Sequence, residues 1–273
     1  MRLALSSYTY TWATGVPGKM PEKRLDAFGL LAEATRLKVP CIQIADNMPL
    51  HELSPAQMQK LKREASDRSI SIEVGARGMS PENLEKYITI AAFFNSPIVR
   101  FVIDGNQFEP SINDVISIIW NALPLLKANS VHLALENHDR FHVTDFKNII
   151  ENTDIEWVGI CLDTVNSFGA AEGIELVVNT LAPFTINLHV KDFTIYRIDH
   201  KMGFIVEGRP AGQGMLPVPW LLREIKNRGK CQTAVLELWT PPEQTLEETI
   251  AKEKKWAEES ISFLQKEINN MNV

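Results

Sequence analysis

The segment Val131-His132-Leu133-Ala134-Leu135-Glu136 is a short apolar run that ends on a carboxylate. Three later segments repeat this pattern, each with one potential metal ligand directly after the apolar residues. They are Val158-Gly159-Ile160-Cys161-Leu162-Asp163, Thr185-Ile186-Asn187-Leu188-His189 and Thr233-Ala234-Val235-Leu236-Glu237. A β-branched or leucine-rich run of about five residues is typical of a strand buried on both faces. Parallel α/β folds place their chemistry at the carboxyl ends of such strands, so we expect the four ligands to meet there.

Eight strands of this kind can be read along the chain, and a helical pattern follows each of them. The predicted strands are 2–8, 41–46, 71–76, 97–103, 132–138, 157–163, 185–191 and 232–238. The predicted helices are 22–37, 54–67, 81–93, 111–128, 143–152, 171–182, 217–228 and 244–268. Eight β-α units in succession predict an α/β protein with one domain, a closed (β/α)8 TIM barrel over residues 1–273.

A doubly wound open sheet is the alternative architecture. Such a sheet normally has a glycine-rich phosphate-binding turn after its first strand, whereas here Tyr8-Thr9-Tyr10-Thr11-Trp12 follows. Two helix starts, Ser54-Pro55 and Ser80-Pro81, have the N-cap serine and first-turn proline that favour helix entry. The stretch 194–216 is expected to be a long irregular loop, and loops of that length are usually functional.

Composition narrows the class of protein. The chain has 273 residues with 45% hydrophobic side chains and a formal charge of −6, which argues against a nucleic-acid-binding surface. No apolar stretch approaches the roughly 18 residues of a membrane span, and the N-terminal segment lacks the apolar core of a signal peptide. The three cysteines, Cys41, Cys161 and Cys231, are odd in number and fall at or inside predicted strands, so free thiols and a cytoplasmic location are expected.

Two Glu, one Asp and one His form a hard, mostly oxygen ligand set. This set predicts one divalent ion per chain, Mn²⁺ first, with Mg²⁺, Co²⁺ or Zn²⁺ as alternatives, because structural Zn²⁺ sites prefer Cys and His. An octahedral ion would keep two open positions, enough to chelate adjacent oxygens of a hydroxy-ketone. A single such residue more often anchors a loop or faces solvent, and only the fourfold repetition makes the metal interpretation strong.

The segments Leu135-Glu136-Asn137-His138, Cys161-Leu162-Asp163-Thr164-Val165-Asn166, Leu188-His189-Val190-Lys191-Asp192 and Leu236-Glu237-Leu238 resemble the xylose-isomerase-like barrel superfamily. They look most like the sugar isomerase and epimerase branch that includes the ketose 3-epimerases. The resemblance covers essentially the whole chain. It implies a Mn²⁺-type ion held by Glu136, Asp163, His189 and Glu237, with Glu136 and Glu237 also acting as the acid/base pair.

Two positions depart from the ketose 3-epimerase pattern. The residue three after the metal Asp is a substrate-binding His in that branch and is Asn166 here. A further Glu lies six residues after the first metal Glu in that branch, where this chain has His142. These departures leave the sugar and the reaction open.

Further candidates for substrate binding lie near the predicted strand ends. His138 or Asn166 could contact the substrate, with loop anchoring and turn formation as the respective alternatives. Lys191 could bind a hydroxyl, phosphate or carboxylate group, or form a salt bridge to a barrel carboxylate. Arg100, inside a strand, is expected to form a buried ion pair under the metal site more readily than to act directly.

The long loop and the C-terminal helix offer weaker signals. Arg209 could hold an anionic group, because neighbouring glycines permit a ligand to approach the backbone closely, although a solvated turn is the alternative. Trp239, with Tyr8, Tyr10 and Trp12, could wall a sugar site or belong to the core. The mixed charges from Lys252 to Glu259 are expected to form a solvated helix face.

The leading functional hypothesis is a metal-dependent sugar epimerase or isomerase that works through an enediolate, with a carbohydrate as its small-molecule partner. The alternative is a lyase or dehydratase that acts on a keto-sugar or keto-inositol on the same scaffold. An endonuclease-like hydrolase is disfavoured, because the resemblance associates that activity with many histidines and this chain has six. A sugar-binding subunit without activity is also considered. A homo-oligomer is compatible with such a barrel, whereas nucleic-acid and membrane partners are not expected.

Overall fold

Eight parallel strands form a closed barrel in the computed structural model, which describes residues 1–271. The order around the barrel is β1-β10-β7-β6-β5-β4-β3-β2. The barrel strands are β1 (Arg2–Ser6), β2 (Cys41–Ile44), β3 (Ser71–Arg77), β4 (Ile98–Val102), β5 (His132–Glu136), β6 (Val158–Asp163), β7 (Thr185–Val190) and β10 (Thr233–Leu236). The predicted (β/α)8 TIM barrel is confirmed, and each predicted strand overlaps one of these eight.

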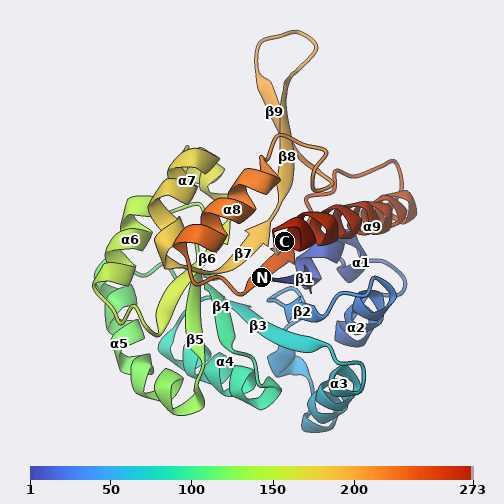
Figure 1. The fold of residues 1–273 in the computed structure, drawn as a ribbon. Helices are drawn as coiled ribbons and strands as arrows, with labels where there is room; N and C mark the ends of the chain where they lie inside the picture. The colour runs from blue at the N-terminus through green and yellow to red at the C-terminus, as the bar shows by residue number, and fades with distance from the viewer. Residues whose placement is uncertain (272–273) are drawn as a thin grey trace.

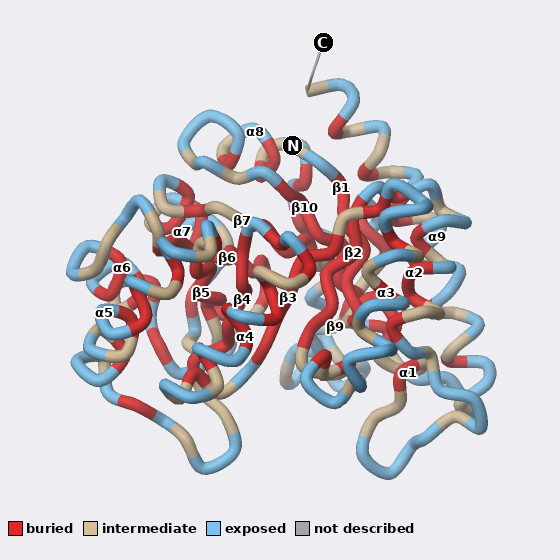
Figure 2. The backbone as a smooth tube through the Cα atoms, turned by 90° about the horizontal axis from the view of Figure 1, so that it is seen from below, coloured by how far each residue is buried: buried red, intermediate tan, exposed pale blue. Residues whose placement is uncertain are grey.

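Helices surround the strands, as Figure 1 shows. They are α1 (Thr11–Thr14), α2 (Ala27–Arg36), α3 (Pro55–Asp67), α4 (Pro81–Phe94), α5 (Ile112–Asn129), α6 (Val143–Glu151), α7 (Ile174–Leu181), α8 (Val218–Arg228) and α9 (Leu246–Asn270). Ser54 and Ser80 cap α3 and α4 through their side chains, as predicted. Figure 2 shows that the barrel strands are largely buried, while the outer faces of the helices are exposed. No helix within residues 1–271 is long and apolar enough to cross a membrane.

The predicted irregular loop 194–216 is wrong for most of its length. Strands β8 (Asp192–Arg197) and β9 (Phe204–Arg209) pair antiparallel and form a hairpin that projects from the ring of helices (Figure 1). Both strands carry β-branched and aromatic residues, such as Ile195 opposite Val206, which favour an extended pair. The hairpin tip at 198–203 and the segment after β9 remain irregular.

The expectation of a solvated face along 252–259 fails at one position. Glu253 is 1% exposed, and its carboxylate accepts hydrogen bonds from the backbone N–H groups of Trp12 and Ala13 at 3.0 and 3.1 Å. These groups lie in the first turn of α1, where an acceptor satisfies otherwise unpaired amides. Glu253 therefore fastens the segment after β1 to α9, a contact between ends of the chain that local sequence does not reveal.

The register of the barrel brings the predicted ligands to one edge. Asp163 is the partner of His189 across β6 and β7, and Glu136 is the partner of Cys161 across β5 and β6. Glu237 directly follows β10, whose Val235 pairs with His189. All four ligand candidates thus lie at the carboxyl ends of adjacent strands, as the sequence predicts.

Candidate metal centre

The four predicted ligands are buried together inside the mouth of the barrel. Glu136, Asp163, His189 and Glu237 are each at most 1% exposed. The Nδ1 atom of His189 lies 3.3 Å from Oε2 of Glu136, 3.3 Å from Oε1 of Glu237 and 3.7 Å from Oδ2 of Asp163. The imidazole therefore stands among three carboxylates.

Three polar atoms in this cluster are buried and have no hydrogen-bond partner among the described residues apart from the Lys191 ammonium, which lies 2.8 Å from two of them. They are Oδ2 of Asp163, Nδ1 of His189 and Oε2 of Glu237. One ligand atom from each of these residues lies within 4.8 Å of the others. Buried polar atoms are normally paired, and potential ligand atoms that converge on one point are suited to bind a cation. The donor set therefore fits a hard divalent cation.

A second group of potential ligand atoms consists of Glu136, Cys161 and His189. Burial raises the pKa of the Cys161 thiol well above its usual range, and its sulfur lies 3.2 Å from Oδ1 of Asn187. A protonated thiol is a poor metal ligand. Glu136 is therefore the better fourth ligand, as the sequence pattern suggests.

Lys191 points into the same space. Burial by itself would raise the pKa of the Asp163 carboxyl, but the Lys191 ammonium and the His189 imidazole outweigh burial and hold the pKa well below its usual range. Burial would likewise raise the pKa of Glu237, but the charges of His189 and Lys191 outweigh burial and lower it. Both groups are thus carboxylates that can bind a cation. Of the two alternatives for Lys191, the structure contains the salt bridge.

Glu136 is held on both of its oxygens. Arg100, which is 3% exposed, donates from Nε to Oε2 of Glu136 and from Nη1 to Oδ1 of Asp46 at 3.0 Å. The Nδ2 atom of Asn166 donates to the other oxygen, Oε1, at 2.8 Å. The expected buried ion pair of Arg100 is therefore present, and Asn166 contacts a predicted ligand rather than only forming a turn.

Several residues at the site escaped the sequence reasoning. Ser6 at the end of β1 donates to Oε1 of Glu237 at 2.9 Å, and Gln43 in β2 lies 2.7 Å from Nε2 of His189. Asp46 accepts hydrogen bonds from Arg100 and from the Tyr8 hydroxyl at 2.8 Å. Polar residues inside or directly after apolar strands, such as Gln43 between Ile42 and Ile44, were the available signal.

Other predicted substrate contacts lie farther from the cluster. His138 is paired through Nδ1 with Asp139 at 3.2 Å, and its Nε2 is 3.5 Å from Arg77. Arg209 is paired with Glu207 at 3.3 Å, and no hydrogen bond or ion pair within residues 1–271 joins it to the four ligands. Trp239 is 41% exposed and lies beneath the base of the hairpin.

The glycines near Arg209 approach protein atoms rather than an open ligand site. A Cβ on Gly208 would lie 2.1 Å from the backbone oxygen of Trp239, and one on Gly214 would lie 2.2 Å from Oδ1 of Asp192. The glycines were predicted to let a ligand approach the backbone closely. They instead allow the hairpin and the following loop to pack closely against other parts of the protein.

The family of the chain follows from a match to a family model. The model described as xylose isomerase-like TIM barrel matches residues 31–267. This match covers most of the sequence, so the chain belongs to the xylose isomerase-like TIM barrel family, as its strand-end motifs suggest.

Three individual proteins are similar to this chain over nearly its whole length. The chain is 27% identical to the 3-oxo-isoapionate decarboxylase of Pectobacterium atrosepticum over 264 residues, covering 97% of this chain and 95% of the relative. It resembles the D-psicose 3-epimerase with D-tagatose from Clostridium cellulolyticum H10 with a TM-score of 0.70 and 15% identity, covering 97% and 99% of the two chains. A Mycobacterium smegmatis xylose isomerase-like TIM barrel protein in complex with magnesium gives a TM-score of 0.67 and 16% identity, covering 95% and 96%. The two structural matches show the shared fold alone.

Proposed function

We propose that the protein is a divalent-metal-dependent enzyme that converts a sugar-derived hydroxy-ketone through an enediolate. The observation that supports this proposal is the convergence of buried potential ligand atoms from Asp163, His189 and Glu237 at the mouth of the barrel, where the two carboxylate oxygens are balanced by the Lys191 ammonium. Glu136 completes the ligand set. Mn²⁺ is the first candidate ion, with Mg²⁺, Co²⁺ and Zn²⁺ as alternatives.

A cation at this position supplies Lewis-acid stabilisation of the substrate oxygens on which negative charge develops. The protein provides the rest of the chemistry. Buried carboxylates fix the charge of the site, and Asn166 and Lys191 place a hydrogen-bond donor and a cation beside the ligands. We assign the other predicted substrate contacts, His138, Trp239 and Arg209, to the wider substrate-binding surface.

The first candidate reaction is epimerisation or isomerisation. One glutamate removes a proton from carbon to give the enediolate, and the other returns a proton to the opposite face or to the neighbouring carbon. We assign the role of base to Glu237, whose Oε2 atom has no hydrogen-bond partner within the described residues apart from the Lys191 ammonium at 2.8 Å. Glu136 would be the second group.

The second candidate reaction is decarboxylation, a lyase reaction, and the contacts of Glu136 favour it. Both oxygens of Glu136 already accept hydrogen bonds, from Arg100 and Asn166, so this carboxylate is poorly placed to shuttle a proton. Loss of CO₂ from a β-keto acid, whose carboxylate is carried by the hydroxylated carbon adjacent to the ketone carbon, leaves the bonding electron pair delocalised into the ketone as an enediolate. One proton then returns to carbon, so a single proton-transfer group is sufficient. The similarity to a decarboxylase over 97% of the chain supports the same choice.

One experiment separates these outcomes. The protein is loaded with Mn²⁺ and incubated in D₂O with a panel of ketoses and 3-oxo sugar acids, and the products are followed by NMR and by CO₂ release. An epimerase or isomerase exchanges a carbon-bound proton and retains every carbon. A decarboxylase releases one CO₂ for each deuterium that enters the product.

Metal content tests the basis of both reactions. We expect about one divalent ion per chain in the wild type and none in Asp163→Ala, because that change removes one ligand of the set. Glu156→Gln, at an exposed carboxylate at the far end of the barrel, is the matched control. A wild-type protein that holds no ion after reconstitution with any of the four metals would contradict the proposal.

A further inference from the structure

A column of polar side chains runs through the barrel beneath the candidate metal centre. Gln43, Glu73 and Asn187 are each at most 1% exposed, although the interior of such barrels is normally filled by bulky branched residues. Burying a carboxylate such as Glu73 costs free energy unless hydrogen bonds compensate. Polar side chains that are not themselves candidate metal ligands therefore need an explanation at these buried positions.

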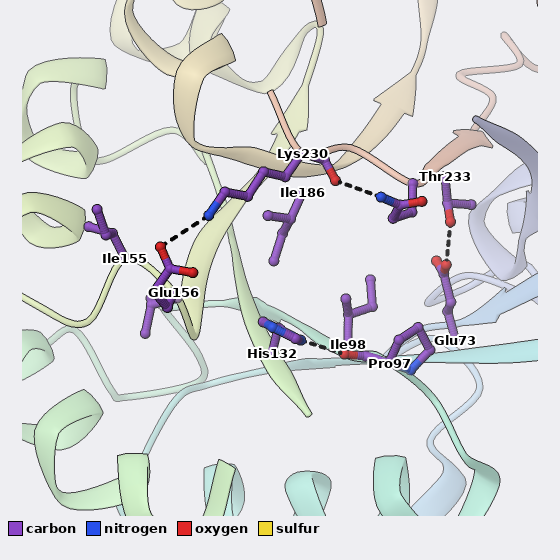
Figure 3. A pocket seen from close by; sticks show the side chains of 11 residues that line it. Glu73, Pro97, Ile98, His132, Ile155, Glu156, Ile186, Lys230 and Thr233 are labelled. Carbon is purple, nitrogen blue, oxygen red and sulfur yellow. Dashed lines mark hydrogen bonds and ion pairs between the residues drawn. The ribbon is translucent and has the colours of Figure 1, made fainter. Parts of the chain in front are cut away.

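Glu73 lies toward the amino ends of the strands, beside a hollow of about 270 Å³ (Figure 3). Its Oε1 atom accepts a hydrogen bond from the Thr233 hydroxyl at 2.6 Å. Its Oε2 atom accepts from Nδ2 of Asn187 at 3.1 Å and from Nε2 of Gln43 at 3.2 Å. Glu73 thus acts only as an acceptor toward these three donors.

The orientation of the Gln43 amide follows from these contacts. Its Nε2 atom faces two acceptors, Oε2 of Glu73 at 3.2 Å and Oδ1 of Asn187 at 3.0 Å. The flipped amide would place the Gln43 oxygen against both oxygens and lose two hydrogen bonds. The oxygen of Gln43 must therefore point the other way, and it lies 2.7 Å from Nε2 of His189.

The amide oxygen has no proton to donate, so the proton of this contact must belong to Nε2 of His189. With Nε2 protonated, the neutral imidazole carries its lone pair on Nδ1. Nδ1 is the atom without a partner, and it faces Glu136, Asp163 and Glu237. The column therefore selects the tautomer that a metal ion at this site requires.

We propose that Gln43 is a positioning residue for the metal centre, and that Glu73 and Asn187 fix its amide so that His189 binds the ion through Nδ1. The inference rests on the proposed metal site and adds residues from β2, β3 and β7 that do not contact the ion. Hydrogen bonds to ligating histidines orient the ring and increase its basicity, and their loss typically weakens metal binding by about 10–100-fold.

The test uses Zn²⁺ alone as the probe, because it is diamagnetic. Affinity is measured by competition with a chelator, and the imidazole nitrogens are observed by ¹H–¹⁵N NMR, with His189 assigned by a His189→Gln variant. We expect Zn²⁺ on Nδ1 and a hydrogen-bonded proton on Nε2 in the wild type. Gln43→Met, which keeps the length of the side chain but removes the acceptor, should bind Zn²⁺ about 10–100-fold more weakly and lose the hydrogen-bonded proton signal.

The double variant Gln43→Glu with Glu73→Gln provides the rescue. In this variant the carboxylate at position 43 accepts from His189, and the amide at position 73 donates to position 43. Both the Zn²⁺ affinity and the Nε2–H signal should therefore return toward wild type. Single Glu73→Gln is the milder control, because the new amide can still turn its oxygen toward Gln43 and Asn187.

Two results would overturn the inference while leaving the metal centre intact. One is wild-type affinity in a Gln43→Met protein that melts like the wild type in EDTA. The other needs no variant, and is coordination of Zn²⁺ through Nε2 of His189 in the wild type. Failure of the wild type to bind Zn²⁺, Mn²⁺, Mg²⁺ or Co²⁺ would instead remove the proposed function, and this inference with it.

Discussion

The Nζ atom of Lys191 lies 2.8 Å from Oε2 of Glu237, a buried carboxylate oxygen with no other hydrogen-bond partner within the described residues. An equal distance separates Nζ from Oδ2 of Asp163. Burial alone would lower the pKa of Lys191, but the two carboxylates outweigh it and raise the pKa above its usual range. A fixed positive charge thus borders the space in which a metal ion would bind.

Replacement of this charge should separate metal binding from turnover. We expect Lys191→Met to bind Mn²⁺ at least as tightly as the wild type, because the ammonium and the dication repel each other and compete for the same oxygens. The variant should nevertheless lose kcat/KM once a substrate is known, since a cation beside the substrate is removed. Calorimetric titration with Mn²⁺ measures the first effect, with Lys230→Met at the opposite end of the barrel as control. Weaker Mn²⁺ binding in Lys191→Met would show that the lysine supports the metal site.

The ion pair between Arg100 and Glu136 should be costly to break from one side. Arg100→Met leaves the carboxylates of Glu136 and Asp46 without their shared counter-charge, and we expect the free energy of unfolding to fall by about 3–5 kcal/mol. Addition of Glu136→Gln should recover part of this loss. Urea denaturation in EDTA measures both effects without a contribution from metal.

The exposed pair of Arg36 and Glu33 is the matched control, and Arg36→Met should cost about 1 kcal/mol or less. Equal losses for Arg36→Met and Arg100→Met would contradict a special role for burial.

Asp192 organises the loop that follows the hairpin. Its carboxylate accepts hydrogen bonds from four backbone N–H groups at 2.8–3.0 Å, those of Phe193, Gly212, Gly214 and Leu216. An asparagine has one acceptor oxygen, so Asp192→Asn should cost about 1–3 kcal/mol for each amide left unpaired. Faster hydrogen exchange over residues 210–216 is the direct readout. Asp199→Asn at the exposed hairpin tip should leave that exchange unchanged.

Glu253 should make the stability of the protein depend on pH. Burial raises its pKa from 4.5 to about 8, an effect that hydrogen bonds from Trp12 and Ala13 offset only in part. A raised pKa in the folded state contributes stability that is complete below 4.5 and is lost as the pH rises through about 8. The stability of the wild type relative to Glu253→Gln should therefore decline between about pH 5 and about pH 9. A difference in unfolding free energy that stays constant over this range would show that Glu253 ionises normally.

Local sequence patterns located the strands of the barrel well but missed its polar interior. The apolar runs before Glu136, Asp163, His189 and Glu237 identify strands because full burial requires continuous apolar residues. Gln43 and Glu73 are single polar residues in similar runs, a signal that does not identify their partners, because those partners are far away in the chain. Gln43 contacts His189 across 146 positions.

The hairpin 192–209 and the burial of Glu253 are two further features that local sequence patterns did not predict. Residues 194–197 and 204–207 include β-branched and aromatic side chains, but eight β-α units already accounted for the barrel, so these residues were expected to lie in an irregular loop. Charges around Glu253 looked uniformly solvated, because only the packing of α9 on the segment after β1 buries one of them.

The sequence by itself determined the eight barrel strands and their order along the chain, the closed barrel and the four candidate ligands. Each of these follows from the periodicity of apolar residues and from the rule that parallel strands end on one face. The tertiary structure alone decided which atoms would face a bound ion. It also decided that Arg100 and Asn166 donate hydrogen bonds to the two oxygens of Glu136, and that Gln43 presents an acceptor to His189. Hydrogen bonds between distant strands fix these choices, because direction and distance arise only when the barrel closes.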